Sequence, residues 1–424
     1  MILKKRSLTF IVACALTITQ LSAQATFKAM SYNLLNFPSQ DYPANRIQYL
    51  EIILTDYQPD IFMVCELNNE AAGVSILNLM QQNINPNYAM ANFVENSSDD
   101  GIGNQNDLQN LLFYNSTKFT LISQNEISTV YRDINHYKLK VNTINQATNP
   151  IYLDAFVAHL KASSGSDNEA YRLQMVSDLE NYLQTLPADS HVIFGGDFNF
   201  YTSSETGFVE LTNPNNHITF VDPANRVGSW HNNINYLNVF SQATRTQTGL
   251  GGATGGFDDR FDFILASENM LTNTDLFYVD NSYQVYGNNG NSNCFNQEIN
   301  SIDCSGSKFS STIREALYNF SDHLPVTLQL QTNESLSVTD LALTNAFEII
   351  GSNLVDAVLS LKISPELSAH QQLSIYDSLG KLIKTINLHN SIYLKEDVSM
   401  LANGLYYIVL QNANTQPLKF IVNH

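Results

Sequence analysis

Residues 191–199 read HVIFGGDFN, an apolar run and two glycines followed by an acid and an amide two positions apart. The apolar part is typical of a buried strand, and we expect a strand over His191–Gly195. Side chains at i and i+2 of an extended chain point the same way, so Asp197 and Asn199 can enter one pocket from a strand end. The stretch therefore predicts a sheet with reactive polar groups at its edge.

Other segments have the same form, an apolar strand that ends in a residue able to contact a metal ion or a phosphate. They are MSYN (30–33), VCELN (64–68), FVAHLK (156–161), and RFD (260–262) together with SDHLP (321–325). One such segment means little, because a Glu after a buried strand is usually solvated and a lone His is usually structural. Strand ends that meet at one edge of a sheet would bring all of these polar residues together.

Short apolar runs alternate with amphipathic segments over residues 25–332, which is the pattern of an α/β domain with covering helices. The predicted strands are Thr26–Tyr32, Asp60–Cys65, Asn110–Tyr114, Ile151–Ala158, His191–Gly195, Phe261–Leu265 and Val326–Leu330. The predicted helices are Arg46–Asp56 and Asn168–Leu186. Two long polar stretches, 213–238 and 283–311, are expected to be functional or cross-linked loops.

The composition describes an acidic globular protein: 424 residues, 44% hydrophobic and only 14% charged, with a formal net charge of −19. This apolar content suffices for a large core, so disorder is excluded. Affinity for nucleic acid rests mainly on Lys and Arg at the phosphates, so the charge argues against a passive polyanion-binding module. It does not exclude a nuclease, because a divalent metal at a carboxylate cluster can bind phosphate.

The order of these polar residues is more specific than any one of them. Asn, Glu, His, Gly-Asp-x-Asn, Asp and Ser-Asp-His follow one another at domain-scale spacing, with GGDFN (195–199), DDRFDFIL (258–265) and SDHLPV (321–326) as the strongest pieces. This order resembles the endonuclease/exonuclease/phosphatase superfamily, which includes deoxyribonuclease I, abasic-site endonucleases, neutral sphingomyelinases and inositol-polyphosphate phosphatases. The resemblance implies a four-layer α/β sandwich, in which two packed mixed β-sheets are flanked by helices.

The resemblance implies a metal site and a catalytic set. Asn33, Glu66 and Asp322 are the predicted metal ligands, and such oxygen ligands favour Mg²⁺, with Mn²⁺ or Ca²⁺ as alternatives. The predicted catalytic residues are His159, Asp197, Asn199, Asp262 and His323. Asp197 would position or deprotonate the attacking water, and Asn199 would bind the phosphate. His323, oriented by Asp262, would contact the phosphate, and His159 would act as general acid or phosphate ligand.

Three further residues are predicted to bind substrate. Asn68 stands where some relatives place a phosphate-contacting Arg, and Lys161 is one of few cations in this part of the chain. Arg260 is either a phosphate contact or a structural ion-pair partner. Deoxyribonuclease I pairs its first histidine with an upstream Glu, and the nearest candidate here is Asp107.

The N-terminus has the features of a cleavable secretory signal over residues 1–24. Lys4, Lys5 and Arg6 precede an apolar run that ends in a small residue at Ala23. A membrane anchor is the alternative, but the run is short and interrupted by Thr and Gln. Cys14 follows a sequence similar to a lipoprotein cleavage box, which is a second alternative.

The C-terminal part forms a separate unit in this interpretation. A polar linker is predicted at residues 333–340 and a small all-β sandwich at 341–424, with LSIYDSLGKLIKT (373–385), DVSMLANGLYYIVLQN (397–412) and LKFIVNH (418–424) as its signatures. These resemble the type A sorting domain of the type IX secretion system of Bacteroidetes. An accessory β-sandwich for surface binding is the alternative. The resemblance implies contact with the type IX secretion machinery and a secreted or surface-attached protein.

Cys294 and Cys304 lie in a polar loop, where an oxidising compartment would let them form a disulfide. A two-Cys metal site is the rival interpretation, but no His is nearby. Cys65, within IFMVCEL, is expected to be a core residue.

The sequence thus predicts a secreted, monomeric, metal-dependent phosphodiesterase, with DNA or RNA as the favoured substrate and no stable membrane insertion. A sphingomyelinase-like or an inositol or sugar phosphate hydrolase is the first alternative, and Tyr283–Tyr286 is the one segment that could serve membrane docking. A catalytically silent binding protein is the second. The complete set of polar residues argues against it.

Overall fold

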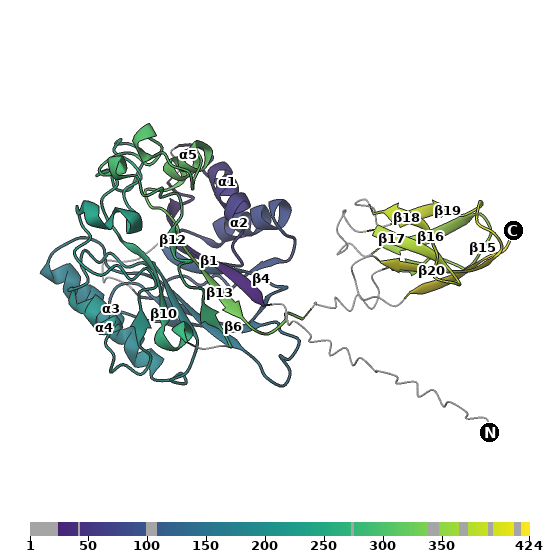
Figure 1. Cartoon of the computed structure of the whole chain (residues 1–424), viewed down its shortest axis with the longest axis horizontal. Helices are drawn as coiled ribbons and strands as arrows, with labels where there is room; N and C mark the ends of the chain where they lie inside the picture. The colour runs from purple at the N-terminus through teal and green to yellow at the C-terminus, as the bar shows by residue number, and fades with distance from the viewer. Residues whose placement is uncertain are drawn as a thin grey trace, which may run out of the picture.

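The computed structural model describes residues 24–40, 43–98, 108–272, 275–337, 347–363, 372–388, 393–410 and 417–424. The predicted signal segment, apart from Gln24, and Asp107 lie outside the described residues. Figure 1 shows an α/β part with labels up to β13, and an all-β part at the C-terminus.

Two mixed sheets form the centre of the α/β part. The first has the order β11-β13-β1-β2-β4-β3, with β12 also paired to β13, and the second has the order β5-β6-β7-β8-β10-β9. In the first sheet the strands are β1 (Ala25–Phe37), β2 (Ile61–Leu67), β3 (Tyr88–Met90), β4 (Gln109–Asn115), β11 (Phe277–Tyr278), β12 (Gln284–Val285) and β13 (Val326–Thr332). In the second they are β5 (Phe119–Ile127), β6 (Ile134–Val141), β7 (Tyr152–His159), β8 (Val192–Asp197), β9 (Phe220–Val221) and β10 (Asp262–Ser267).

The inner faces of the two sheets pack directly on each other. The rings of Phe27 on β1 and Phe119 on β5 lie 4.8 Å apart. Gly195 on β8 leaves no room for a side chain, because a Cβ atom there would lie 2.7 Å from Met63 of β2 and 3.3 Å from Ser31 of β1. The close approach at Gly195 brings the ends of β1, β2 and β8 near one another.

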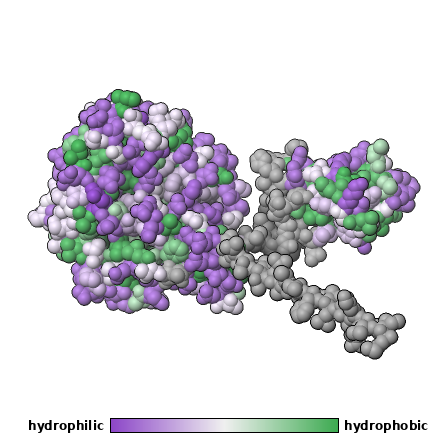
Figure 2. Space-filling view, in the orientation of Figure 1, coloured by the Kyte–Doolittle hydropathy of each residue, from purple (hydrophilic) through white to green (hydrophobic). Residues whose placement is uncertain are grey.

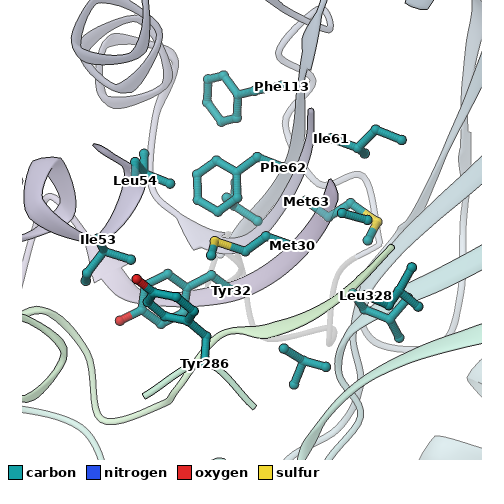
Figure 3. Packing of buried hydrophobic residues seen from close by; sticks show 14 of the residues in the cluster. Met30, Tyr32, Ile53, Leu54, Ile61, Phe62, Met63, Phe113, Tyr286 and Leu328 are labelled. Carbon is teal, nitrogen blue, oxygen red and sulfur yellow. The ribbon is translucent and has the colours of Figure 1, made fainter. Parts of the chain in front are cut away.

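Helices cover both outer faces. They are α1 (Ile47–Tyr57), α2 (Glu70–Asn83) and α5 (Ser311–Phe320) on the first sheet, and α3 (Ser166–Leu183) and α4 (Thr206–Leu211) on the second. Short 3₁₀ helices are η1 (Ile234–Val239), η2 (Glu268–Leu271), η3 (Ser292–Cys294) and η4 (Ile302–Cys304). Figure 3 shows Tyr32 of β1 and Phe62 of β2 lying against Ile53 and Leu54 of α1. The predicted four-layer sandwich is confirmed.

All seven predicted strands and both predicted helices are present, with shifts of a few residues at their ends. Helices α2 and α5 were not predicted. Helix α5 falls just after the polar stretch 283–311, where Ser310 caps it by accepting a hydrogen bond from Ile313 N at 3.3 Å. Within that stretch, Cys294 and Cys304 form a disulfide, with their Cα atoms 4.4 Å apart.

The C-terminal part consists of two sheets around a core of its own. One has the order β14-β16-β19 and the other β15-β21-β20-β17-β18. Their strands are β14 (Phe347–Ile349), β15 (Leu354–Val355), β16 (Val358–Ile363), β17 (Gln372–Asp377), β18 (Leu382–Asn387), β19 (Tyr393–Asp397), β20 (Gly404–Leu410) and β21 (Leu418–Val422). The predicted all-β character of this part is confirmed.

The described part of the predicted linker, residues 333–337, pairs with the turn after β6. Leu336 forms a bridge with Thr143, and Ser337 N donates to Asn142 O at 2.7 Å. Ser335 O accepts from Ile144 N at 3.0 Å. The α/β part therefore continues beyond β13 by at least five residues.

Polar residues cover much of the visible surface, with smaller apolar patches between them (Figure 2). None of the helices in the described ranges combines the length and the apolar character needed to cross a membrane.

Candidate active site

Three predicted residues lie in one row across the second sheet. In the strand register His159 of β7 pairs with Asp197 of β8, and Asp197 pairs with Asp262 of β10. Asn33 of β1 meets this row from the first sheet, because its Nδ2 donates to Asp197 Oδ2 at 3.1 Å. The two packed sheets thus bring four strand ends to one point, as the sequence predicted.

Glu66 reaches the same point through an irregularity in β2. Regular alternation would turn Glu66 to the helix-covered face with Val64. Instead Glu66 has φ 57°, and the pairing of β2 with β4 shifts register between Val64 and Leu67. Its Oε1 accepts from Asn33 Nδ2 and its Oε2 from Asn36 N, both at 2.9 Å. A left-handed conformation is costly for a non-glycine residue, and such strain is typical of functional positions.

Glu66, His159 and Asp197 fit a divalent cation. Their ligand atoms all lie within 4.8 Å of one another. His159 Nδ1 is 3.8 Å from Glu66 Oε1, and Nε2 is 3.6 Å from Asp197 Oδ2. Among the residues that the structure describes, which exclude Asp107, the buried Nδ1 has no hydrogen-bond partner.

The pKa shifts of Glu66, His159 and Asp197 are also consistent with a cation site. Burial raises the pKa of Asp197 to about 8, with the neighbouring carboxylates adding to the rise and His323 opposing it. Burial, followed by the charge of Asp322, also raises the pKa of Glu66. Burial lowers the pKa of His159 well below its usual range, which keeps a ring nitrogen free to bind metal. A divalent cation would offset the negative charge that these carboxylates bring together.

The other two predicted ligands, Asn33 and Asp322, stay predictions, and the structure places them differently from Glu66. Asn33 Oδ1 accepts from Leu35 N at 2.9 Å, so the amide turns its N–H side, which cannot bind a metal, toward the carboxylates. Asp322 Oδ2 accepts from Ala253 N at 2.7 Å and lies 3.9 Å from His323 Nε2, outside the group formed by Glu66. Asp322 supports the loop at Ala253, an interaction that a sequence motif does not reveal.

His323 and Asp262 form a buried dyad. His323 Nδ1 lies 2.7 Å from Asp262 Oδ2, and Nε2 lies 3.7 Å from Asp197 Oδ2. Burial alone would lower the pKa of His323, but the carboxylates of Asp262, Asp322 and Asp197 outweigh it and hold that pKa well above the usual range. Ser321 Oγ accepts from His323 N at 3.1 Å and donates to Asn33 O at 2.8 Å, which ties the dyad to β1.

Asn199 follows β8 in a left-handed conformation, with φ 55°. Its backbone N donates to Asp197 Oδ1 at 3.2 Å, and its Nδ2 donates weakly to Leu160 O at 3.4 Å. Asn199 therefore lies beside the row of carboxylates, and among the described residues a single long hydrogen bond holds its amide.

The predicted substrate-binding residues are placed differently from one another. Asn68 Oδ1 accepts from Ser39 N at 3.1 Å, in the loop that follows β1. Lys161 follows His159 by two residues, and its Nζ lies 5.0 Å from the ring centre of Tyr131 and donates to Ala162 O at 3.1 Å. Both are only partly buried near the site.

Arg260 is a structural residue in this geometry, the second of the two predicted alternatives. Its guanidinium is fully buried and donates to both oxygens of Asp222, at 2.7 and 2.8 Å. It also donates to the hydroxyl of Tyr283 at 3.2 Å and stacks 4.2 Å from the ring centre of Phe263. A guanidinium enclosed in this way has no face left for a phosphate.

Two residues near the site were not predicted. Arg132 is buried and donates to the main-chain oxygens of His159 and Leu160, each at 3.3 Å. Gln242 Nε2 lies 2.6 Å from His323 Nε2 and 3.1 Å from Asp322 Oδ2. An amide carries no charge pattern and belongs to none of the recognised motifs, so no signal in the sequence could have pointed to Gln242.

The chain belongs to the Endonuclease/Exonuclease/phosphatase family, whose profile it matches over residues 30–323, more than half of its length. Residues 356–423 match the Secretion system C-terminal sorting domain. Both resemblances are thereby confirmed: this is a member of a family of phosphoric ester hydrolases that carries a sorting domain for export by type IX secretion.

The chain is also similar to solved structures. A humanized TDP2 of D. rerio is 14% identical, with 72% of this chain and 99% of that chain covered and a TM-score of 0.44. The human Nocturnin catalytic domain with bound sulfate is 15% identical, with 73% and 95% covered and a TM-score of 0.42. An endonuclease/exonuclease/phosphatase from Bacteroides vulgatus is 13% identical, with 72% and 98% covered and a TM-score of 0.45. A comparison with curated proteins found no match.

Proposed function

We propose that this chain is an exported, divalent-metal-dependent phosphodiesterase whose substrate is DNA or RNA. The observation that carries the proposal is the single point at which Glu66, His159 and Asp197 meet the Asp262–His323 dyad. A catalytically silent protein would gain nothing from burying so many ionisable groups together, because each costs desolvation energy.

Glu66 would hold the cation, with His159 and Asp197 as the further ligands, and Mg²⁺ suits the two carboxylates, with Mn²⁺ or Ca²⁺ as alternatives. When bound, the cation neutralises a phosphate oxygen and stabilises the charge that develops in the transition state. Asp197 would also position the attacking water and accept its proton. His323, held by Asp262, would present Nε2 to the phosphate.

A nucleic acid is the favoured substrate over a lipid phosphodiester. The tyrosines that left room for membrane docking point inward: Tyr283 bonds Arg260, and Tyr286, only 3% exposed, packs on Tyr57 and Phe309. Nothing in the described part of the chain specifically favours an inositol phosphate or a sugar phosphate as substrate. We propose that the enzyme acts as a monomer and that the predicted signal segment and the sorting domain direct it out of the cell.

Glu66→Gln tests the metal assignment. Loss of an electrostatic stabiliser costs about 10²–10³ in rate, so the variant should lose that much activity with Mg²⁺ on plasmid DNA, single-stranded DNA or RNA. It should also lose the rise in melting temperature that Mg²⁺ gives to the wild-type protein, since a ligand stabilises only a state that binds it.

Glu126→Gln is the matched control, because it makes the same change on β5, where Glu126 accepts from Gln124 instead of facing the active site. A Glu66→Gln variant that keeps more than about a tenth of the wild-type rate would remove Glu66 from the metal site. Hydrolysis of sphingomyelin or inositol phosphates, without cleavage of any nucleic acid, would move the proposal to the alternative substrates.

A further inference from the structure

Gln242 enters the active site from the segment between η1 and β10. Its Nε2 lies 2.6 Å from His323 Nε2 and 3.1 Å from Asp322 Oδ2. Asp262 occupies Nδ1 of the same ring at 2.7 Å. Nε2 is therefore the ring nitrogen left for a substrate, and the amide of Gln242 lies where a phosphate oxygen would approach it.

The orientation of this amide is set by its neighbours. A carboxylate only accepts hydrogen bonds, so Asp322 Oδ2 requires the N–H side of Gln242. Asp322 is itself fixed, because the same oxygen accepts from Ala253 N at 2.7 Å. The amide group carries two hydrogens. One is used by Asp322, and the other points to the position of His323 Nε2.

The main chain of Gln242 is held on both sides. Gln242 forms β-bridges with Asp259 and with His323. Its N donates to Asp259 O at 3.0 Å, and its O accepts from Asp258 N at 3.0 Å and Asp259 N at 2.8 Å. A donor on so rigid a support is preorganised, which is the property that makes hydrogen-bond donors effective against developing negative charge.

A second amide faces the same nitrogen. Asn33 Nδ2 lies 3.4 Å from His323 Nε2, and its Oδ1 is tied to Leu35 N. Two amide nitrogens, of Gln242 and Asn33, therefore flank the imidazole. Asn33 uses its two amide hydrogens for Glu66 and Asp197, so Gln242 is the amide with an N–H for a phosphate oxygen bound to His323.

We propose that Gln242 is a catalytic residue that donates, together with His323, to one non-bridging oxygen of the reacting phosphate. The inference rests on the proposed phosphodiesterase function. It assigns to the substrate the N–H of Gln242 that points toward His323, and its other N–H to Asp322. A different role would be purely positional, in which Gln242 keeps Asp322 and the imidazole in place and never contacts the phosphate.

Gln242→Met separates the two roles, because methionine has a similar length but no N–H. The substrate is a nitrophenyl nucleotide diester in which one or the other non-bridging oxygen is replaced by sulfur, a weaker acceptor. Assays in Mn²⁺, which is softer than Mg²⁺, limit the effect of sulfur on the metal. Gln40→Met is the matched control, since the Gln40 amide donates to Leu250 O at 3.2 Å in a neighbouring loop and has no contact with His323.

We expect Gln242→Met to lower kcat by about 10²–10³ with little change in KM, as for the loss of one preorganised donor. Wild-type enzyme should be slowed by sulfur at one of the two positions, and Gln242→Met should lose that preference. Gln40→Met should behave like wild type. A variant that keeps the wild-type preference between the two sulfur isomers would overturn the proposal, because a purely positional residue leaves the preference intact.

Orthovanadate binding gives a measurement that does not depend on turnover. Calorimetric titration in Mg²⁺ should show binding to the wild-type protein and about tenfold or more weaker binding to Gln242→Met, since one lost hydrogen bond to a charged group costs about 1.5–3 kcal/mol. Equal affinities, or no binding by wild type, would overturn the inference. If vanadate binding depends on Gln242 while no phosphodiester is hydrolysed, the contact stands and the proposed function fails.

Discussion

Asp197 is the residue at which the interactions of the site converge. Its Oδ2 accepts from Asn33 and lies 3.6 Å from His159 Nε2 and 3.7 Å from His323 Nε2. A carboxylate buried among other carboxylates is unfavourable unless a proton or a cation offsets it. Asp197 is held in place by its pairing with β7 on one side and β10 on the other. The stability of the two sheets therefore offsets the desolvation free energy of burying this carboxylate.

His159 and His323 should respond differently to the leaving group of the substrate. If His159 protonates the leaving oxygen instead of binding the cation, His159→Ala should cost about 10²–10⁴ in rate on plasmid DNA. A nitrophenyl phosphodiester scarcely needs protonation, so the same variant should be nearly as fast as wild type on it. His323→Ala should be slow on both substrates, because His323 contacts the phosphate itself. Steady-state rates on the two substrates measure this.

The comparison carries its own control, because each variant is tested on both substrates. A loss of only a few-fold on plasmid DNA for His159→Ala would make His159 a structural strand-end residue. Rescue of His323→Ala by the nitrophenyl ester would give His323 the role of general acid instead.

The Asp222–Arg260 pair should contribute stability that depends on pH. Burial alone would raise the pKa of Asp222, but Arg260 outweighs it and holds that pKa below the usual range. The stabilisation is therefore fully present above the ordinary pKa of an aspartate and is lost as pH falls through the lowered value. Asp222→Asn leaves a buried guanidinium without its partner, which should cost about 3–5 kcal/mol at neutral pH.

Denaturant unfolding at neutral pH and in acid measures this difference. The gap between wild type and Asp222→Asn should shrink as pH falls, because protonation removes the same charge from the wild-type protein. Asp280→Asn, which changes an exposed carboxylate, should stay within about 0.5 kcal/mol of wild type. A gap that is constant with pH would mean that the pair contributes no charge-dependent stability.

The sequence predicts residues of the site where strand alternation decides their direction. Asn33, Asp197 and Asp262 follow that rule, and so the sequence alone predicts that they lie together. Glu66 could be found from its motif only, since regular alternation points it the wrong way. Gln242 could not be found, because its position depends on bridges between segments far apart in the sequence.

Among the elements, the polar stretch 283–311 has a defined structure although its sequence has no apolar periodicity. It contains β12, η3, η4 and a disulfide, and Asn289 fixes its ends through hydrogen bonds to Cys304 O and Phe309 O at 3.0 and 3.2 Å. Asn side chains here bond to the main chain, in addition to the core contacts of Tyr286, Ile299 and Phe309. Strands and amphipathic helices were predictable from apolar patterns, whereas this excursion has none.

Removing the disulfide should destabilise this excursion. Cys294 and Cys304 close a loop with a sequence separation of 10, for which the chain-entropy estimate is about 2.5–3 kcal/mol. The double variant Cys294→Ala with Cys304→Ala should lose that much free energy of unfolding. Its activity at low temperature should be nearly unchanged, because neither cysteine contacts the catalytic residues.

Reductant is the control for the disulfide. It should lower the melting temperature of wild type toward that of the double variant and leave the double variant itself unchanged. Equal stability of the two proteins without reductant would show that hydrogen bonds alone order the loop.

At the scale of the whole molecule, the α/β part and the C-terminal part have separate apolar cores. The α/β part has a core between its sheets and helices, and the C-terminal part has a separate one that includes Leu359, Ile375 and Ile408. None of the candidate metal groups among the described residues lies in the C-terminal part. We therefore expect that truncation can separate the catalytic part from the sorting domain. The structure indicates where the chain should be cut.

The structure predicts that a cut after Ser337 differs from a cut after Thr332. The chain from Gln24 to Ser337 should be folded and as active as the full chain, since it retains both sheets and all catalytic residues. Expressed with the signal segment, it should stay in the periplasm for want of a sorting domain. A cut after Thr332 also removes Leu336, which packs against the core, and the hydrogen bonds of Ser335 and Ser337.

The shorter form should lose about 1–3 kcal/mol of unfolding free energy, since the packing of one partly buried leucine and the largely exposed hydrogen bonds of residues 333–337 are lost. Chemical denaturation of the two truncated forms measures this difference in stability. Their rates on a nitrophenyl diester should agree, because Asn142 and its neighbours lie on β6 and the following turn, away from the catalytic row. Equal stabilities would make residues 333–337 a free linker, as the sequence first suggested. An inactive longer form would mean that the C-terminal part takes part in catalysis.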